Sequence, residues 1–301
     1  MPRRMLRAAA ICMRRPLVVV VAGFLVLSAI AVGDAGALVV RPLRGHTTVN
    51  VGGAFVPTHG VAADLHSTVV DSANWSGYVD KGTGISSVST NFVVPGVNPF
   101  PPGGFAGLWA GIGGVDSSDL IQAGVSVQTL PSLPLVGPQY YAWYELLPGG
   151  EIPLTDCTAV GTGKAVTCAV APGDAMAVNI QSVGGSSSKW TITMANFTLG
   201  WTSTTPVADY KSSESSAEWI LEAPTLLVLQ SYLANVGRVA FTNSTFTEDG
   251  ALKTIASGGP AQFDLTEPII LPVIEGATPS ALGPDGKSFN DCAYARSCPA
   301  P

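Results

Sequence analysis

Between Asn74 and about Pro272, apolar side chains alternate with polar ones over short stretches, and this pattern limits the fold more than any other feature of the chain. Thr, Val, Ser, Tyr and Trp are frequent in these stretches, and Gly, Pro, Asn or Ser separate them. No segment keeps a 3.6-residue apolar period for three helical turns. Many short strands without intervening helices predict an all-β fold, a β-sandwich or a barrel.

Eight segments show the strand pattern most clearly. They are Ser86–Val94, Gly107–Ile112, Leu120–Val127, Gln139–Leu146, Ala175–Val183, Trp190–Phe197, Ser215–Leu221 and Gly237–Thr245.

Alternation also assigns faces, because neighbouring side chains on a strand point to opposite sides. In four of these strands, one face carries glycines, an aromatic side chain, a carboxamide or a carboxylate, as a ligand-holding sheet would. These faces carry Trp109, Gly111 and Gly113; Gln122, Gly124 and Ser126; Tyr141, Trp143 and Glu145; and Glu218, Ile220 and Glu222.

Histidine is absent from residues 74–301, because His46, His59 and His66 all lie upstream. This excludes Ser-His-Asp and Cys-His catalysis from that portion, together with any histidine-ligated zinc or iron site. The same portion has 8 Lys and Arg against 18 Asp and Glu, a formal net charge of −10. A surface of that sign repels phosphate, so we expect no nucleic-acid partner. The chemistry that remains belongs to carboxylates, amides, hydroxyls and a few lysines.

The cysteines downstream of the leader form two closely spaced pairs, Cys157 with Cys168 and Cys292 with Cys298. In a secreted chain such pairs predict disulfides. A four-cysteine zinc site is the alternative, but the pairs are more than a hundred residues apart and lack Cys-x-x-Cys spacing. We expect neither a metal nor a cofactor.

The N-terminus has the pattern of a secretory signal peptide. Five arginines precede an apolar run of 16 residues, Leu17–Val32, and Ala35-Gly36-Ala37 follows it. We therefore expect residues 1–37 to be removed and the mature chain to be extracellular, without stable membrane association. An uncleaved anchor is the alternative, although the run is shorter than the roughly 20 residues of a membrane span.

The rest of the chain divides by composition into three parts. Residues 38–73 are irregular and are either a flexible N-terminus or a pro-segment that becomes a stronger cation in acid, when its three histidines are protonated and add to the charge of its two arginines. Residues 74–277 are the predicted sandwich domain. Residues 278–301 are a Pro-, Gly- and Ser-rich tail held by the second cysteine pair. We expect a monomer.

A set of short motifs occurs in one order along residues 74–247. The motifs are Asn74-Trp75-Ser76-Gly77-Tyr78, Trp109-Ala110-Gly111-Ile112-Gly113-Gly114, Ile121-Gln122-Ala123-Gly124-Val125, Tyr141-Ala142-Trp143-Tyr144-Glu145, Ala217-Glu218-Trp219-Ile220-Leu221-Glu222 and Val239-Ala240-Phe241-Thr242-Asn243.

Together these motifs resemble the glutamic peptidase family, the eqolisins. The resemblance implies an antiparallel sandwich of two sheets, similar to legume lectins and jelly rolls. It also implies a catalytic pair of one glutamine and one glutamate, which map onto Gln122 and Glu218. The implied activity is that of a secreted, acid-acting endopeptidase whose partners are polypeptide substrates.

The chemistry of the two side chains fits that pair. A carboxyl group with a reference pKa of about 4.3 is matched to acidic pH, where an imidazole stays protonated. Glu218 would take a proton from water and pass it to the leaving amide nitrogen. Gln122 does not titrate, so its amide can donate a hydrogen bond to the oxyanion at any pH. We expect both at the floor of an open groove.

Four neighbouring side chains are candidates for substrate binding. Trp109, Tyr141, Trp143 and Glu145 match motifs of the family cleft, and packing within the sheet face is the alternative for each. Repulsion between Glu145 and Glu218 would raise the pKa of one of them. Glu222 is expected on the surface.

One position departs from the family pattern. Fungal members usually carry Asp where this chain has Gly113, so Asp116 or Asp119 in the following loop is a candidate substitute.

Two other functions compete with the peptidase. A sandwich glycoside hydrolase would use Glu145 and Glu218 as its two carboxylates. A binding module without catalysis would use the aromatic side chains alone.

Overall fold

The computed structural model describes residues 31–32, 38–39, 69–99, 103–129, 137–226, 229–267 and 274–301. The chain divides into two compact units, Met1–His46 and Thr47–Pro301. In the first unit, β1 (Ala31–Val32) pairs antiparallel with β2 (Leu38–Val39). The predicted cleavage site of the signal peptide and most of the 38–73 segment lie outside the described residues. In the part of the chain that is described, no helix is long and apolar enough to cross a membrane.

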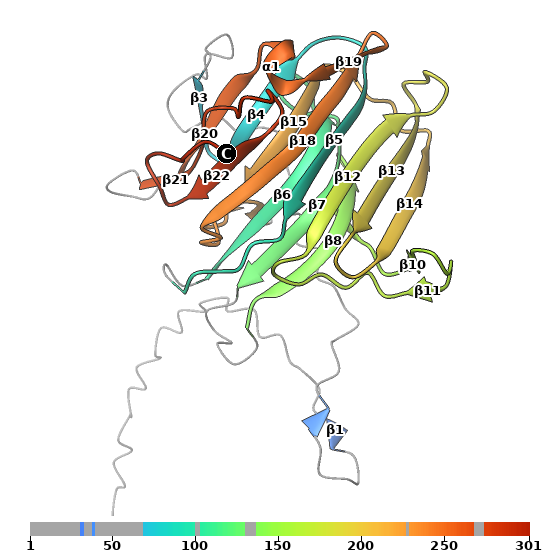
Figure 1. Cartoon of the computed structure of the whole chain (residues 1–301), viewed down its shortest axis with the longest axis vertical. Coiled ribbons are helices and arrows are strands. Elements are labelled where there is room, and N and C mark those ends of the chain that lie inside the picture. The colour runs from blue at the N-terminus through green and yellow to red at the C-terminus, as the bar shows by residue number, and fades with distance from the viewer. Residues whose placement is uncertain are drawn as a thin grey trace, which may run out of the picture. The chain divides into compact units, whose positions relative to one another are not determined.

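The second unit contains two large sheets, which Figure 1 shows as one layer in front of the other. The front sheet has the order β22–β18–β5–β12–β13–β14–β10–β11. Its strands are β22 (Phe289–Ala293), β18 (Arg238–Glu248), β5 (Ile85–Val93), β12 (Ala175–Ser182), β13 (Lys189–Asn196), β14 (Trp201–Ala208), β10 (Cys157–Ala159) and β11 (Ala165–Val166).

The back sheet has the order β21–β20–β4–β15–β6–β7–β8–β9. Its strands are β21 (Ile274–Pro279), β20 (Ala261–Glu267), β4 (Trp75–Lys81), β15 (Ser216–Glu222), β6 (Gly104–Gly113), β7 (Leu120–Thr129), β8 (Gln139–Leu146) and β9 (Ile152–Pro153). All of these pairs are antiparallel. The short β3 (Val69–Ser72) adds a parallel pair to β20.

Small elements complete the unit. The strand β19 (Ala251–Thr254) pairs with β18 and leads into α1 (Ile255–Gly258), while β16 (Thr225–Leu226) pairs with β17 (Leu229–Gln230). The two sheets are also hydrogen-bonded to each other along one edge, through β21 and β22.

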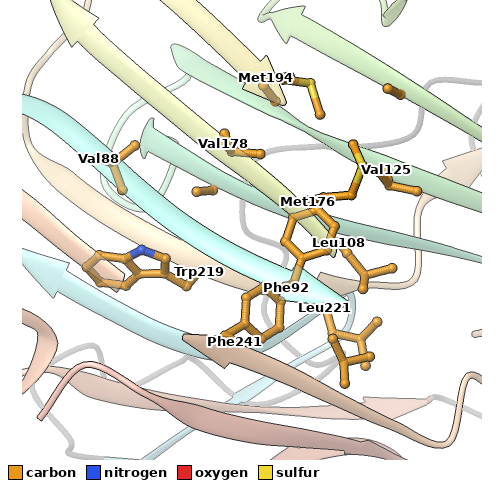
Figure 2. Packing of buried hydrophobic residues seen from close by; sticks show 14 of the residues in the cluster. Val88, Phe92, Leu108, Val125, Met176, Val178, Met194, Trp219, Leu221 and Phe241 are labelled. Atoms are coloured by element: carbon orange, nitrogen blue, oxygen red, sulfur yellow. The ribbon is translucent and has the colours of Figure 1, made fainter. Parts of the chain in front are cut away.

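The apolar core lies between the sheets. β5 packs on β6 and β15, and β12 packs on β6 and β7. Figure 2 shows the side chains that fill this space, among them Phe92 from the front sheet and Leu108 and Trp219 from the back sheet. All three are at most 2% exposed. The predicted antiparallel sandwich of two sheets is therefore confirmed.

All eight predicted strands are present, with ends within a few residues of those expected. The strand β14 was missed because its sequence, WTSTTPVA, is rich in threonine and lacks clear apolar alternation. The segment predicted as a tail differs most. The boundary after residue 277 falls inside β21, and β22 lies in the sheet with every residue buried, so the folded unit continues at least to Ala293.

Both predicted disulfides are confirmed. Cys157 is bonded to Cys168 with an S–S distance of 2.06 Å, and Cys292 is bonded to Cys298 at 2.03 Å. The first joins β10 to the segment just after β11, and the second ties the C-terminal residues to β22.

Candidate active site

Four strands of the back sheet bring the predicted polar faces together. The register pairs Glu218 of β15 with Gly111 of β6, Gly111 with Gln122 of β7, and Gln122 with Glu145 of β8. These four residues form one row across the sheet. The residues that alternate with them belong to the core between the sheets, so the row lies on the opposite, outer face of the back sheet.

Gly111 separates the two members of the predicted pair. Neighbouring strands lie about 4.8 Å apart, so the main chains at Gln122 and Glu218 are about 10 Å apart. A β-carbon at Gly111 would lie 2.9 Å from Cζ3 of Trp109 and 3.0 Å from Cδ1 of Leu120. The side chains of Trp109 and Leu120 therefore already occupy the space that a side chain at Gly111 would take.

Both members of the pair are buried. Gln122 and Glu218 are each 0% exposed, so the predicted open groove is wrong for this state of the protein. The reason is an outer apolar cluster on the same face, which comprises Val70, Trp75, Val79, Trp109, Leu120, Trp143, Ile220 and Phe263.

The polar atoms of the pair are only partly satisfied. Nε2 of Gln122 donates a hydrogen bond to Oε2 of Glu145 at 2.7 Å. Oε1 of Gln122 and both carboxylate oxygens of Glu218 have no hydrogen-bond partner of good geometry among the residues that the structure describes. Unpaired buried acceptors are costly, so this spot favours a molecule that brings hydrogen-bond donors.

Burial also controls the charge of Glu218. Desolvation raises the pKa of Glu218 well above its usual value, and the negative charges of Asp119 and Asp80 add to this, while the nearby Ser216 hydroxyl acts in the opposite direction.

Glu145 lies beside Gln122 rather than beside Glu218. Burial raises the pKa of Glu145 to about 9, and Glu222 and Glu151 add to the shift, while the hydrogen bond from Gln122 lowers it. The expected repulsion between Glu145 and Glu218 is therefore not among the causes.

Glu222 is the residue that sequence reasoning misplaced. It is 0% exposed instead of lying on the surface. Its Oε2 accepts a hydrogen bond from Nε1 of Trp109 at 2.8 Å, and its Oε1 accepts one from Nδ2 of Asn74 at 3.3 Å. Alternation had placed Glu222 on the right face, and its cross-strand neighbour Gly107 was the available signal that a side chain could be accommodated there.

The aromatic candidates differ in exposure. Trp109 and Trp143 are 0% exposed within the outer apolar cluster, and the ring of Trp109 meets that of Trp75 edge-on at 5.1 Å. Tyr141 keeps some exposed surface and accepts a hydrogen bond from Nε2 of Gln128 at 2.6 Å. Substrate binding by Trp109, Tyr141, Trp143 and Glu145 remains a prediction.

The two acids in the loop after Gly113, Asp116 and Asp119, have different surroundings. A β-carbon at Gly113 would lie 3.1 Å from Oδ2 of Asp119. Asp116 instead forms an exposed ion pair with Lys81 at 2.9 Å. Within the described residues, no group of three or more His, Cys, Asp or Glu side chains could hold a metal ion.

Comparison with known proteins points to one family. The model of the peptidase A4 family matches residues 73–267. Aspergillopepsin-2 of Aspergillus niger is 27% identical over 208 residues, which cover 60% of this chain and 66% of that protein, just under two thirds of its length.

Solved structures show the same fold. Scytalido-glutamic peptidase with a transition state analog inhibitor is similar with a TM-score of 0.57 at 17% identity, covering 77% of this chain and 100% of that one. Aspergilloglutamic peptidase from Aspergillus niger is similar with a TM-score of 0.50 at 23% identity, covering 63% of this chain and 99% of that one.

Proposed function

This chain belongs to the peptidase A4 family, the eqolisins or glutamic peptidases, and we propose that it hydrolyses peptide bonds with Gln122 and Glu218 as its reacting pair. The observation that carries the proposal is the row across the back sheet. The register sets the Glu218 carboxyl group and the Gln122 carboxamide on either side of Gly111, on one face of the sheet. A scissile carbonyl group above Gly111 would then have its attacking water beside Glu218 and its oxygen beside Gln122.

Glu218 acts first as a base. It takes a proton from the water whose oxygen bonds to the scissile carbonyl carbon, and it then gives that proton to the amide nitrogen as the carbon–nitrogen bond breaks. Because burial raises the pKa of Glu218, the protonated form that exists between these steps is stabilised. The same shift means that activity should rise with pH through a range above the ordinary pKa of a glutamate.

Gln122 stabilises the oxyanion. Its amide carries two N–H groups, and one of them is used by Glu145. The other can donate to the oxygen that becomes negative, and the hydrogen bond to Glu145 holds the carboxamide in this orientation. Glu145 therefore acts through Gln122.

Access requires the outer apolar cluster to move. Trp109 and Leu120 border the space over Gly111, and an extended peptide reaches the pair only when these side chains shift.

We propose that the enzyme acts in the acidic range. Its lower limit is the ionisation of Glu218.

Gly111→Val tests whether the substrate occupies the space above Gly111, between Gln122 and Glu218. The branched side chain would stand between Gln122 and Glu218 and against Trp109, so we expect kcat/KM for a peptide to fall at least about 100-fold, as for loss of one oxyanion donor. Gly96→Val is the matched control, because nothing lies within 4 Å of a β-carbon there. Equal losses in both variants, or none at Gly111, would contradict the proposed path of the substrate.

A protein digestion assay tests the function itself. The full chain, expressed with its own N-terminus and collected from the medium, is expected to digest casein or haemoglobin under acidic conditions. N-terminal sequencing of that product reports whether residues 1–37 and the proposed pro-segment, residues 38–73, have been removed.

Parallel assays on a protein and on a polysaccharide separate the peptidase from the two competing functions. In a glycoside hydrolase, Glu145→Gln would abolish activity on a polysaccharide while Gln122→Ala kept it. This is disfavoured because Gln122 lies between Glu145 and Glu218 in the row and is bonded to Glu145. Folded, processed protein with neither activity would indicate a binding module.

A further inference from the structure

Asp119 lies where a side chain at Gly113 would lie. The backbone of Gly113 has φ = +94°, and a β-carbon there would be 2.6 Å from the carbonyl oxygen of Asp119 and 3.1 Å from its Oδ2. Only glycine tolerates both the positive φ and this close approach. Gly113 is on the same face as Gly111, two residues along β6, so Asp119 reaches the edge of the row from the loop between β6 and β7.

Hydrogen bonds fix the carboxylate there. Oδ2 of Asp119 accepts the backbone N–H of Ser213 at 2.6 Å. The hydroxyl of Ser117 donates to the carbonyl oxygen of Asp119 at 3.2 Å and lies 3.1 Å from that of Ser213, which is in turn 2.9 Å from the hydroxyl of Ser215. The loop is thus tied to the segment that enters β15 just before Glu218.

We propose that Asp119 is a positioning residue that acts through Glu218: its carboxylate, held by Ser213 beside Gly113, places a second negative charge at the edge of the row. That charge favours the protonated form of Glu218. This rests on the proposed function, because the protonated form of Glu218 matters most between removal of a proton from water and its delivery to the leaving nitrogen. Asp119 itself transfers no proton.

The other charged groups around Glu218 leave this role to Asp119. From β4, Asp80 lies on the core face of the sheet, and Lys81 is paired with Asp116. From β6 there is only Gly111, and from β7 only the neutral Gln122. On β15 itself, Glu222 is held by Trp109 and Asn74. Asp119 is the acid whose carboxylate reaches the outer face of the sheet, at Gly113, and it keeps some solvent exposure.

Asp119→Asn removes the charge and keeps an oxygen that can accept the Ser213 N–H. We expect the acidic limb of the profile of kcat/KM against pH to move about half a pH unit lower, because a like charge near a carboxyl group raises its pKa. Asp119→Glu should restore most of the profile. The control is Asp116→Asn, which removes an equal charge from the same loop and should leave the limb in place. A loss of activity without movement of the limb would indicate a structural role and overturn the proposal.

A second measurement does not depend on activity. Carboxyl ¹³C NMR follows the titration of Glu218 in the wild type and in Asp119→Asn, with Glu218→Gln used to assign the signal. A titration midpoint that falls in Asp119→Asn but not in Asp116→Asn supports the inference even if no peptide is cleaved, in which case the proposed function alone fails. Unchanged midpoints would overturn it.

Discussion

Glu218→Gln is expected to lower kcat for peptide hydrolysis by about 10²–10⁴-fold, the usual contribution of a general acid–base group. The substitution changes one oxygen to an amide and keeps the volume of the side chain, so the packing of β15 stays the same. It also removes a buried ionisable group whose oxygens have no partner among the described residues. The variant should therefore fold and unfold at a temperature no lower than that of the wild type.

Gln122→Ala should also lower kcat for peptide hydrolysis. Loss of one oxyanion donor costs about 10²–10³-fold in kcat. Gln128→Ala is the matched control, because Gln128 is on the same face of β7, is partly exposed, and donates its hydrogen bond to Tyr141. Steady-state kinetics on one peptide, with thermal unfolding of each variant alongside, measure the effect. Full activity in Glu218→Gln or in Gln122→Ala would remove that side chain from the mechanism.

The stability of the fold should fall steeply as pH rises. Burial raises the pKa of Asp80 to about 8, that of Glu145 to about 9 and that of Asp291 to about 8. The pKa of Glu218 is also raised. In the unfolded chain these groups ionise near their ordinary values of about 4.

The sign follows from linkage. Between about pH 4 and pH 8–9 the folded state holds protons that the unfolded state has lost, so the free energy of unfolding decreases with rising pH. It is greatest below about pH 4, where these carboxyls are protonated in both states. A shift of four units corresponds to about 5 kcal/mol for one group, against a typical net stability of about 5–15 kcal/mol. Glu248 and Asp285 have lowered pKa values and act in the opposite direction. Asp285 is exposed, which weakens its effect, and Glu248 is partly exposed and paired with Lys253.

Thermal unfolding followed by circular dichroism from pH 3 to pH 9 measures this dependence. We expect a high, flat unfolding temperature in acid and a decline of tens of degrees toward pH 8–9. Asp80→Asn and Asp291→Asn should each reduce the slope, because each removes one group that must ionise. Asp156→Asn, at an exposed carboxyl just before β10, should leave it nearly unchanged. An unfolding temperature that stays constant or rises between pH 4 and pH 8 would contradict the prediction.

The sequence predicts on which face of the sheet a side chain lies better than it predicts which side chains lie next to it. Alternation correctly put Gln122, Glu145 and Glu218 on faces turned away from the core, because the period of two depends only on local backbone geometry. Their arrangement in one row depends on strand order and register. Both are set by long-range pairing, for example of β15 between β4 and β6, and no local pattern specifies that.

Burial of polar groups was the hardest property to predict. Glu222 has a polar side chain in a strand, which usually means exposure, and its place beneath Trp109 depends on a hydrogen bond that forms only in the folded sheet. The strand β22 was missed for a similar reason, since Asn290 and Asp291 interrupt its apolar pattern. They are buried because the carboxylate of Asp291 accepts a hydrogen bond from Ser76 and Asn290 donates one to the carbonyl oxygen of Pro299.

The most direct measurement is a crystal structure of the processed protein with a peptide analogue that carries a tetrahedral hydroxyl group in place of the scissile carbonyl. We predict that the tetrahedral centre lies above Gly111, with one oxygen about 2.6–3.2 Å from the Glu218 carboxyl and another at the same distance from Nε2 of Gln122. An analogue bound elsewhere, or one that contacts only one of these two side chains, would contradict the assignment of Gln122 and Glu218 as the reacting pair.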